Sequence, residues 1–405
     1  MLVPKLRFKR EDGTDYPEWR YARADKIAEI NPKTSDLPNR FYYMDLGSVS
    51  RGVWQEKTIT DKDNAPSRAN RLASVGDVFF QSVRPYNMGH FFFEEEYEYP
   101  VVASTGFIQL RATQEYYNGF IYQLLYEDRF NAEVNIRCTG SNYPAINSEN
   151  FSDIEMLFPC LEEQQKIADF LATVDEVIAQ SEAEVQNLEQ QKKAAMQKIF
   201  SQEVRFKRED GTDYPEWEEK ALSDISEFIT KGTTPKKYSE NGGVNFVQIN
   251  SIVDGAINTD KCLRIDEETH NGFLSRSVLF ENDILCSIAG ALGVIAVVNK
   301  DVLPANTNQA LAIIRLNEGC NHRYIAFALS SYVMEKYIKQ CKTVGAQPNL
   351  SLAQIRDMIV PFPCLKEQQK IADFLSAYDE AISYAKQELD KWKELKKGLL
   401  QQMLV

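Results

Sequence analysis

The chain lacks most of the residues and patterns on which enzyme active sites are built. Its 405 residues include three histidines, and its seven cysteines form no C-x-x-C pair, so a metal site of clustered His and Cys ligands is not expected. It has no P-loop, no dinucleotide-binding glycine motif and no N/D-P-P-F/Y tetrapeptide of an adenine methyltransferase. No nucleophile, base and orienting group form a recognisable set. We therefore expect a chain without catalysis of its own.

Long apolar runs and positive charge are also scarce. The longest apolar run, residues 284–298, is interrupted by Gly290 and Gly293 and is too short to span a bilayer, so it predicts two strands around a glycine turn. No secretory leader is recognisable, and the cysteines are interpreted as reduced thiols of a cytoplasmic protein. Lys and Arg number 46 against 59 Asp and Glu, a net charge of −13, which argues against a free-standing nucleic-acid binder.

The chain does contain two long internal repeats. The segment RFKREDGTDYPEW stands at residues 7–19 and again at 205–217, and FPCLEEQQKIADFLATVDEVI at 158–178 returns with few changes at 362–382. This order is that of a tandem duplication of start segment, variable stretch and helix. The variable stretches, roughly 20–150 and 218–355, look unrelated in sequence. Constant ends with divergent middles indicate a shared scaffold that carries two different readers.

The second repeat opens a long helix in each half. Its apolar residues recur at steps of four and three over more than four heptads, with Lys192 and Lys396 at matching seam positions, which predicts a coiled coil. We expect the helices to pack antiparallel, as a rod of about 60 Å for roughly 40 residues. The alternative is two unrelated surface helices. The predicted partner-helix seam consists of Ile167, Leu171, Val174, Ile178, Val185, Leu188, Ile199, Ile371, Leu375, Tyr378, Ile382, Leu389, Trp392 and Leu399.

The variable stretches alternate short strands, turns and helices. Residues 246–255 and 310–316 have strand character, whereas 116–135 and 322–341 have helical spacing. The predicted fold class is therefore α/β (α+β), with two mixed α/β domains joined by two long antiparallel coiled-coil helices. The predicted segments are a first domain at 1–157, a first helix at 158–203, a second domain at 204–361 and a second helix at 362–405.

Several loops combine planar donors, aromatic rings and glycine or proline. Such side chains reach the base edges and phosphates of nucleic acids. The loop pair TGSNYPAI (139–146) and VGAQPNL (344–350) stands just before each constant helix. The alternative is that these are solvated turns or plain linkers. The candidate DNA-binding residues are Arg84, Tyr86, Asn87, Asn142, Tyr143, Lys231, Thr233, Thr234, Lys236, Lys237, Tyr238, Gln248, Asn250, Gln347 and Asn349.

The first repeat is interpreted as the entry strap of each domain rather than as a binding tag used twice. Asp12-Gly13 and Asp210-Gly211 predict a turn, and Trp19 and Trp217 are expected to anchor the strap by packing. Its two identical copies would then do the same structural job at two helix–domain junctions.

At this point the chain resembles the DNA specificity subunits of type I restriction–modification systems, over essentially its whole length. The resemblance rests on LEEQQKIADFL and LKEQQKIADFL, on QINSIVDG, ENDILCSIAGALG and GAQPNLSLAQIRDMIVPFPCL, and on INPKT, YYMDLGSVS and VGDVFFQSVRPYN. It implies a non-catalytic subunit that reads a bipartite DNA site, one half per variable domain. It also implies assembly with two methyltransferase subunits that use S-adenosylmethionine, and recruitment of two restriction subunits that use ATP and Mg. No cofactor is expected in this chain itself.

Two readers on one stiff rod can recognise two short, unlike sequences at a set separation. Reading both from one face of DNA favours centres about 10 base pairs apart. Phosphate contacts supply much of the affinity for DNA, so we expect the methyltransferase partners to supply much of the positive surface. The rival interpretations are a coiled-coil scaffold or adaptor that binds only proteins, which fits the acidity, and an enzyme with an unrecognised site.

Overall fold

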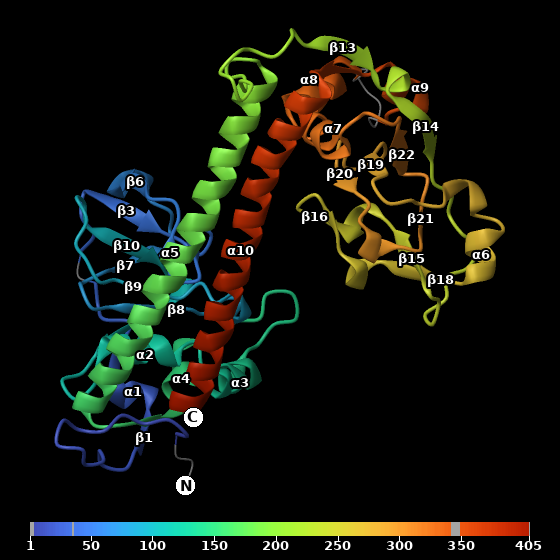
Figure 1. The fold of residues 1–405 in the computed structure, drawn as a ribbon. Helices are drawn as coiled ribbons and strands as arrows, with labels where there is room; N and C mark the ends of the chain where they lie inside the picture. Colours follow the sequence, from blue (N-terminus) through green and yellow to red (C-terminus); the bar gives the residue numbers. More distant parts are fainter. Residues whose placement is uncertain (1–3, 35, 342–348, 405) are drawn as a thin grey trace. The chain divides into compact units, whose positions relative to one another are not determined.

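The computed structural model describes residues 4–34, 36–341 and 349–404. The chain divides into two compact units: the first holds residues 1–183 and 386–405, and the second holds residues 184–385. Each unit contains a mixed α/β domain, part of helix α5 (Leu161–Phe200) and part of helix α10 (Leu365–Met403). The predicted fold class, two mixed α/β domains with two long packed helices, is confirmed (Figure 1).

Two four-stranded sheets form the domain of the first unit. One sheet has the order β2 (Ala28–Ile30), β11 (Phe107–Ala112), β8 (Val78–Gln81) and β9 (Phe91–Phe92). The other has the order β6 (Thr58–Asp61), β3 (Arg40–Met44), β10 (Val101–Ser104) and β7 (Ala69–Leu72). A hairpin of β4 (Val49–Ser50) and β5 (Val53–Trp54) and a pair of β1 (Arg20–Arg23) with β12 (Glu155–Phe158) complete it.

Short helices cover one face of the first of these sheets. Phe80 of β8 packs its ring against Phe130 and Phe151, so the sheet and helices share one core with the beginning of α5. The predicted helical stretch 116–135 is two helices rather than one. The helices of this domain are α1 (Ala24–Ile27), α2 (Asn118–Leu124), α3 (Asp128–Arg137) and α4 (Ser148–Ser152).

The domain of the second unit repeats most of this topology, but its second sheet has three strands instead of four. One sheet has the order β14 (Ser226–Lys231), β22 (Leu311–Leu316), β19 (Ile284–Ser287) and β20 (Ile295–Val297). The other has the order β18 (Leu263–Ile265), β15 (Val244–Val247) and β21 (Ala305–Thr307), with β15 and β21 parallel as β3 and β10 are. The variable stretches, which look unrelated in sequence, are two versions of one fold.

The remaining elements of the second unit also match the first. The run 284–298 folds as the antiparallel pair β19–β20 across a glycine turn, as predicted. The predicted helical stretch 322–341 is broken at Ser330 and Ser331 into two helices. These elements are β13 (Glu218–Ala221), β16 (Ile252–Val253), β17 (Ala256–Ile257), α6 (Glu267–Asn271), α7 (His322–Leu329), α8 (Tyr332–Cys341), α9 (Leu352–Asp357) and β23 (Ile359–Phe362).

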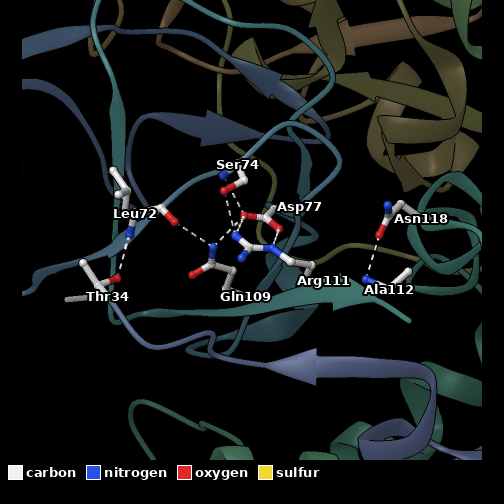
Figure 2. A network of polar contacts seen from close by, with 8 residues as sticks. All are labelled: Thr34, Leu72, Ser74, Asp77, Gln109, Arg111, Ala112 and Asn118. Atoms are coloured by element: carbon white, nitrogen blue, oxygen red, sulfur yellow. Dashed lines mark hydrogen bonds and ion pairs between the residues drawn. The ribbon is translucent and has the colours of Figure 1, made fainter. Parts of the chain in front are cut away.

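A buried carboxylate pairs with an arginine of the neighbouring strand in one sheet of each domain. In the first unit the fully buried Asp77 accepts bidentate hydrogen bonds from Arg111 at 2.8 and 2.9 Å and a third from the Gln109 amide at 2.7 Å (Figure 2). In the second unit Asp283 accepts two hydrogen bonds of 2.8 Å from Arg315. Arg111 lies on β11, which pairs with β8, the strand that begins after Asp77. Arg315 lies on β22, which pairs with β19, the strand that begins after Asp283. Such a bidentate pair fixes geometry as well as charge.

Helices α5 and α10 lie side by side and antiparallel (Figure 1). Lys192 Nζ lies 2.5 Å from the Asp379 carboxylate in the second unit, and Lys396 Nζ lies 2.5 Å from Asp175 in the first. From Asp175 to Lys192 the residue number rises along α5, while the number of the partner in α10 falls from 396 to 379, so the helices run antiparallel. Every predicted seam residue is buried or half-buried. The end residues serve two purposes, because Ile167, Leu171, Ile199, Ile371 and Leu375 also belong to the domain cores.

The two straps dock on the first turn of the long helices. Glu163 of α5 is fully buried and accepts hydrogen bonds from Arg7 Nε at 3.0 Å, Arg7 Nη2 at 2.8 Å and Trp19 Nε1 at 3.2 Å. In the second unit Glu367 accepts the same three bonds from Arg205 and Trp217. The repeated segment and the repeated helix motif are therefore two halves of one joint.

The predicted turns and anchors of the straps are also present. Gly13 and Gly211 adopt φ of 84° and 82°, the left-handed region that favours glycine. Trp19 is buried, and Trp217 packs against the core of its own unit. These features agree with a structural strap.

Candidate nucleic-acid interface

The first candidate surface is built by the loop that follows β8. Its residues Arg84 and Met88 have positive φ of 52° and 53°, which is uncommon for side chains other than glycine and asparagine. Pro85 is buried, whereas Tyr86 and Asn87 are exposed. The turn thus directs its polar and aromatic side chains to solvent and holds its proline inside.

A second loop, residues 139–146, lies against the first. Val83 and Ala145 form a β-bridge, and the Arg84 amide donates to the Pro144 carbonyl at 2.7 Å. The Arg84 guanidinium stacks over the Tyr143 ring at 4.2 Å from its centroid. The structure therefore brings Arg84, Tyr86, Asn87, Asn142 and Tyr143 into one pair of loops, with the last four exposed. A cation, two rings and two amides can serve both phosphate and base-edge contacts.

The second candidate surface is the loop 231–243 of the second unit. Its start is seated tightly, because a Cβ on Gly232 would stand 2.1 Å from the Thr307 carbonyl oxygen, and the Thr233 amide donates to that carbonyl at 3.0 Å. Thr234 hydrogen-bonds the Gln309 side chain. Beyond this seat the loop projects outward. Its exposed members are the candidates Lys231, Thr234, Lys236, Lys237 and Tyr238, together with Glu240, Asn241 and Gly243.

Two residues beside this loop escaped the sequence analysis. Phe273 is 54% exposed and lies under the Lys236 ammonium, 5.5 Å from the ring centroid. Arg276 donates a hydrogen bond of 3.2 Å to Thr233 Oγ1. Both come from the segment after α6, about 40 positions along the chain. Nothing in their local sequence indicates that the fold delivers them to the lysine loop.

Four further candidates complete the predicted set. Gln248 is half-buried at a short 3-10 turn, where its backbone N–H donates to Ser251 Oγ at 3.3 Å and its backbone carbonyl accepts from the Ser251 N–H at 2.9 Å. Asn250 and Asn349 are exposed. Gln347 lies outside the described residues. The structure thus groups the first unit's candidates more closely than the second's.

The buried group below the first loop is His90. Its ring stacks on Phe80 at a centroid distance of 4.7 Å, and its Nδ1 accepts a hydrogen bond of 3.1 Å from the Gln81 backbone N–H. Complete burial lowers the pKa of His90 to about 3, so the imidazole is neutral at neutral pH. It supports the loop and is not a ligand group.

Other classes of site find little support in the part of the chain that the structure describes. Within residues 4–34, 36–341 and 349–404, no three His, Cys, Asp or Glu side chains are placed to hold a metal ion. The same residues include no helix that is long and apolar enough to cross a membrane.

Two domains of similar topology with unlike exposed loops are carried on paired helices. A family model described as the type I restriction modification DNA specificity domain matches residues 55–190 and 214–393. The chain belongs to this family of DNA specificity domains.

Relatives of the chain are specificity subunits of type I restriction enzymes. It is 26% identical over 277 residues to the MjaVIII specificity subunit of Methanocaldococcus jannaschii, covering 65% of this chain. It is 24% identical over 310 residues to the EcoBI specificity subunit of Escherichia coli, covering 70% of this chain. Each match spans 64% of the relative's own length. The S subunit of M. genitalium shares the fold, with a TM-score of 0.60 and 16% identity over 100% of this chain and 99% of that one.

Proposed function

We propose that this chain reads a bipartite DNA sequence, each unit recognising one half-site. The observation that carries the proposal is a shared framework with different exposed loops. The buried Asp–Arg pair, the strand order and the docked strap recur in both units, whereas the loops that follow them differ in sequence. Selection for two different ligands on one scaffold would leave this pattern.

The loops offer the contacts that DNA recognition needs. In the first unit Arg84, Asn87 and Asn142 supply planar donors and acceptors for base edges. In the second unit the lysines at 231, 236 and 237 supply phosphate contacts, and Arg276 lies beside them. We propose Arg84, Tyr86, Asn87, Asn142, Tyr143, Lys231, Thr233, Thr234, Lys236, Lys237, Tyr238, Asn250, Asn349, Phe273 and Arg276 as the contact set. Gln248 and Gln347 remain candidates from sequence.

The paired helices would set the unread spacer and dock two methyltransferase subunits. Those partners would bring S-adenosylmethionine, and two restriction subunits would bring ATP and Mg. The net charge of −13 makes a large share of positive surface on the partners necessary, because phosphate contacts dominate affinity for DNA.

The experiment uses the chain in complex with its methyltransferase subunits, acting on DNA of random sequence with S-adenosylmethionine. Mapping methyladenine by single-molecule sequencing should return two short motifs separated by a fixed gap. Arg84→Ala should relax the sequence preference in one half of the motif and leave the other half unchanged. The matched control is Arg129→Ala, because Arg129 also lies over a tyrosine ring, Tyr21, but outside the candidate loops.

The rival function, an adaptor that binds only proteins, predicts a different result. Methylation without any motif, or a motif unchanged by Arg84→Ala and by Lys236→Ala alike, would remove the DNA-reading assignment. A single unbroken motif would remove the assignment of one half-site to each unit.

A further inference from the structure

One residue at the same place in each domain closes the loop that follows it. Gln81 ends β8 and pairs with Phe107, the first residue of β11, while Ser287 ends β19 and pairs with Leu311, the first residue of β22. These two strand-end residues are 4% and 0% exposed. They differ in size and chemistry, but both direct polar atoms into the loop beyond them.

Gln81 bridges the two ends of the loop 82–89. Its amide nitrogen donates to the Val83 carbonyl at 2.8 Å and to the Arg84 carbonyl at 3.2 Å. Its amide oxygen accepts from the Gly89 backbone N–H at 2.8 Å. A Cβ on Gly89 would stand 2.2 Å from that oxygen, so the close approach requires glycine.

Ser287 performs the same closure with a hydroxyl. Its Oγ donates to the Ala291 carbonyl and accepts from the Val294 backbone N–H at 2.8 Å. The Gly293 amide donates to the Ser287 carbonyl at 3.0 Å. The loop 288–294 is shorter than its counterpart, and the smaller side chain is sufficient to span it.

The backbone after each strand-end residue is fixed in the same way in both units. The Ser82 amide donates to the Gly106 carbonyl, and the Ser82 carbonyl accepts from Ile146. In the second unit the Ile288 amide donates to Ala310, and the Ile288 carbonyl accepts from Leu350. These bonds seat the beginning of each loop beside residues 139–146 or Asn349. The strand-end side chains differ between the two seats, and the Ser82 hydroxyl adds a bond of 2.7 Å to the Gly106 carbonyl that Ile288 cannot make.

The loop conformation in the first unit depends on this closure. Arg84 and Met88 hold positive φ values that their side chains disfavour, and the carbonyl of Arg84 is one of the groups that the Gln81 amide holds. Buried amide and carbonyl groups that lose their partners are costly. Without Gln81 the turn would rearrange, and Arg84 would leave its place over Tyr143.

From these contacts we infer that Gln81 and Ser287 are positioning residues for sequence reading that do not touch the DNA. Gln81 fixes the loop that carries Arg84, and Ser287 fixes the equivalent loop 288–294, which the Leu350 N–H ties beside the candidate contact residue Asn349. This inference rests on the proposed function. It assigns half-site specificity in part to two buried side chains. Because each residue acts within its own unit, each should control one half-site and leave the other unchanged.

The experiment selects duplexes from a random-sequence pool with the intact complex at one salt concentration. Gln81→Met has a similar size and removes all three side-chain hydrogen bonds. It should lower the preference for the first unit's half-site over single mismatches by roughly tenfold, the effect of one lost base-pair discrimination. Gly89→Ala should act on the same half-site by displacing the Gln81 amide. Ser287→Ala should lower the preference for the second unit's half-site over single mismatches. Ser287→Thr keeps the hydroxyl and should retain that preference.

The matched controls lose buried hydrogen bonds away from the loops. Gln109→Met removes the amide that bonds Leu72 and Asp77, and Ser331→Ala removes a hydroxyl that bonds Ala328. If the melting temperature falls equally in Gln81→Met and Gln109→Met and neither half-site relaxes, the positioning role is wrong. Relaxation of both half-sites by one variant would also overturn it. If the unmodified complex selects no bipartite sequence, the proposed function fails first, and the inference fails with it.

Discussion

The two units differ most in their exposed loops and least where each domain holds a long helix. Glu163 and Glu367 each accept the same three bonds from an arginine and a tryptophan of a strap. The loops beyond β8 and β19, by contrast, share neither sequence nor closing side chain. A buried carboxylate with fixed partners tolerates little change, whereas an exposed loop tolerates much. The comparison separates the frame of the molecule from its variable reading parts.

The largest test of this comparison removes the strap arginines. Arg7→Met leaves the fully buried Glu163 with only the Trp19 N–H, and Arg205→Met does the same to Glu367. Breaking a buried pair on one side costs about 3–5 kcal/mol. We expect each substitution to lower the free energy of unfolding by a similar amount in urea denaturation, because the two joints are built alike.

The control comes from the same straps. Lys9 and Lys207 form exposed pairs with Asp15 and Asp213, each at 3.8 Å. Lys9→Met and Lys207→Met should therefore change the unfolding midpoint very little. Unequal losses for Arg7→Met and Arg205→Met would show that the repeated joint is not equivalent in the two units.

The frame was largely predictable from the sequence. The helix seam follows from its heptad spacing, and the role of the strap follows from its turn and tryptophan. The partner of the strap did not follow, because Glu163 stands about 150 positions away and only the fold brings it to Arg7. The common topology of the variable stretches was hidden for the same reason. Asp77 and Asp283 occupy matching places, but the residues around them have diverged.

The proposed reading surface was predictable in part. Arg84, Tyr86 and Tyr143 were selected because their residue types stand out in short polar loops, and the structure places them in one pair of loops. Phe273, Arg276 and Gln81 were missed, because their importance depends on neighbours far along the chain. Gln248 stays a prediction, and it is half-buried at a local turn that its backbone holds to Ser251.

A smaller effect is the pH dependence of stability that His90 gives to the first unit. The pKa of His90 is lowered to about 3 by burial, below its ordinary value of about 6.5. The unfolded chain therefore binds the proton first, and stability falls as pH falls from 6.5 towards 3. Between pH 7 and pH 5 the loss is about 2 kcal/mol, at about 1.4 kcal/mol per pH unit below 6.5. The pairing of β20 with β19 puts the apolar Ile295 at the matching place of the second unit.

Urea denaturation of the protein and of His90→Phe at pH 7 and pH 5 measures this effect. The difference between the two proteins removes the contribution of every other titrating group. We expect the variant to lose about 2 kcal/mol less than the unmodified chain over this range. An equal loss would mean that His90 is already protonated, or exposed, in the folded state.

The smallest effect concerns the lysines in the helix seam. Each unit has one Lys–Asp pair across the two helices, but the two pairs differ in how exposed they are. Lys396 and Asp175 are 16% and 35% exposed, and Asp175 also accepts a hydrogen bond of 2.9 Å from Gln123. Lys192 and Asp379 are 21% and 45% exposed. Partly exposed pairs couple weakly, and the coupling grows with burial. We expect about 1 kcal/mol for the first pair and about half of that for the second.

Double-mutant cycles on the two pairs give these coupling energies directly. Lys396 and Lys192 are replaced by methionine, which keeps the length of the apolar stem, and the aspartates by asparagine. The exchanged pair Lys192→Asp with Asp379→Lys should recover part of the loss of either single reversal, because the charges meet again across the antiparallel helices. A coupling near zero in both cycles, or a larger one for the more exposed pair, would contradict the burial argument and leave the apolar seam residues alone responsible for pairing the helices.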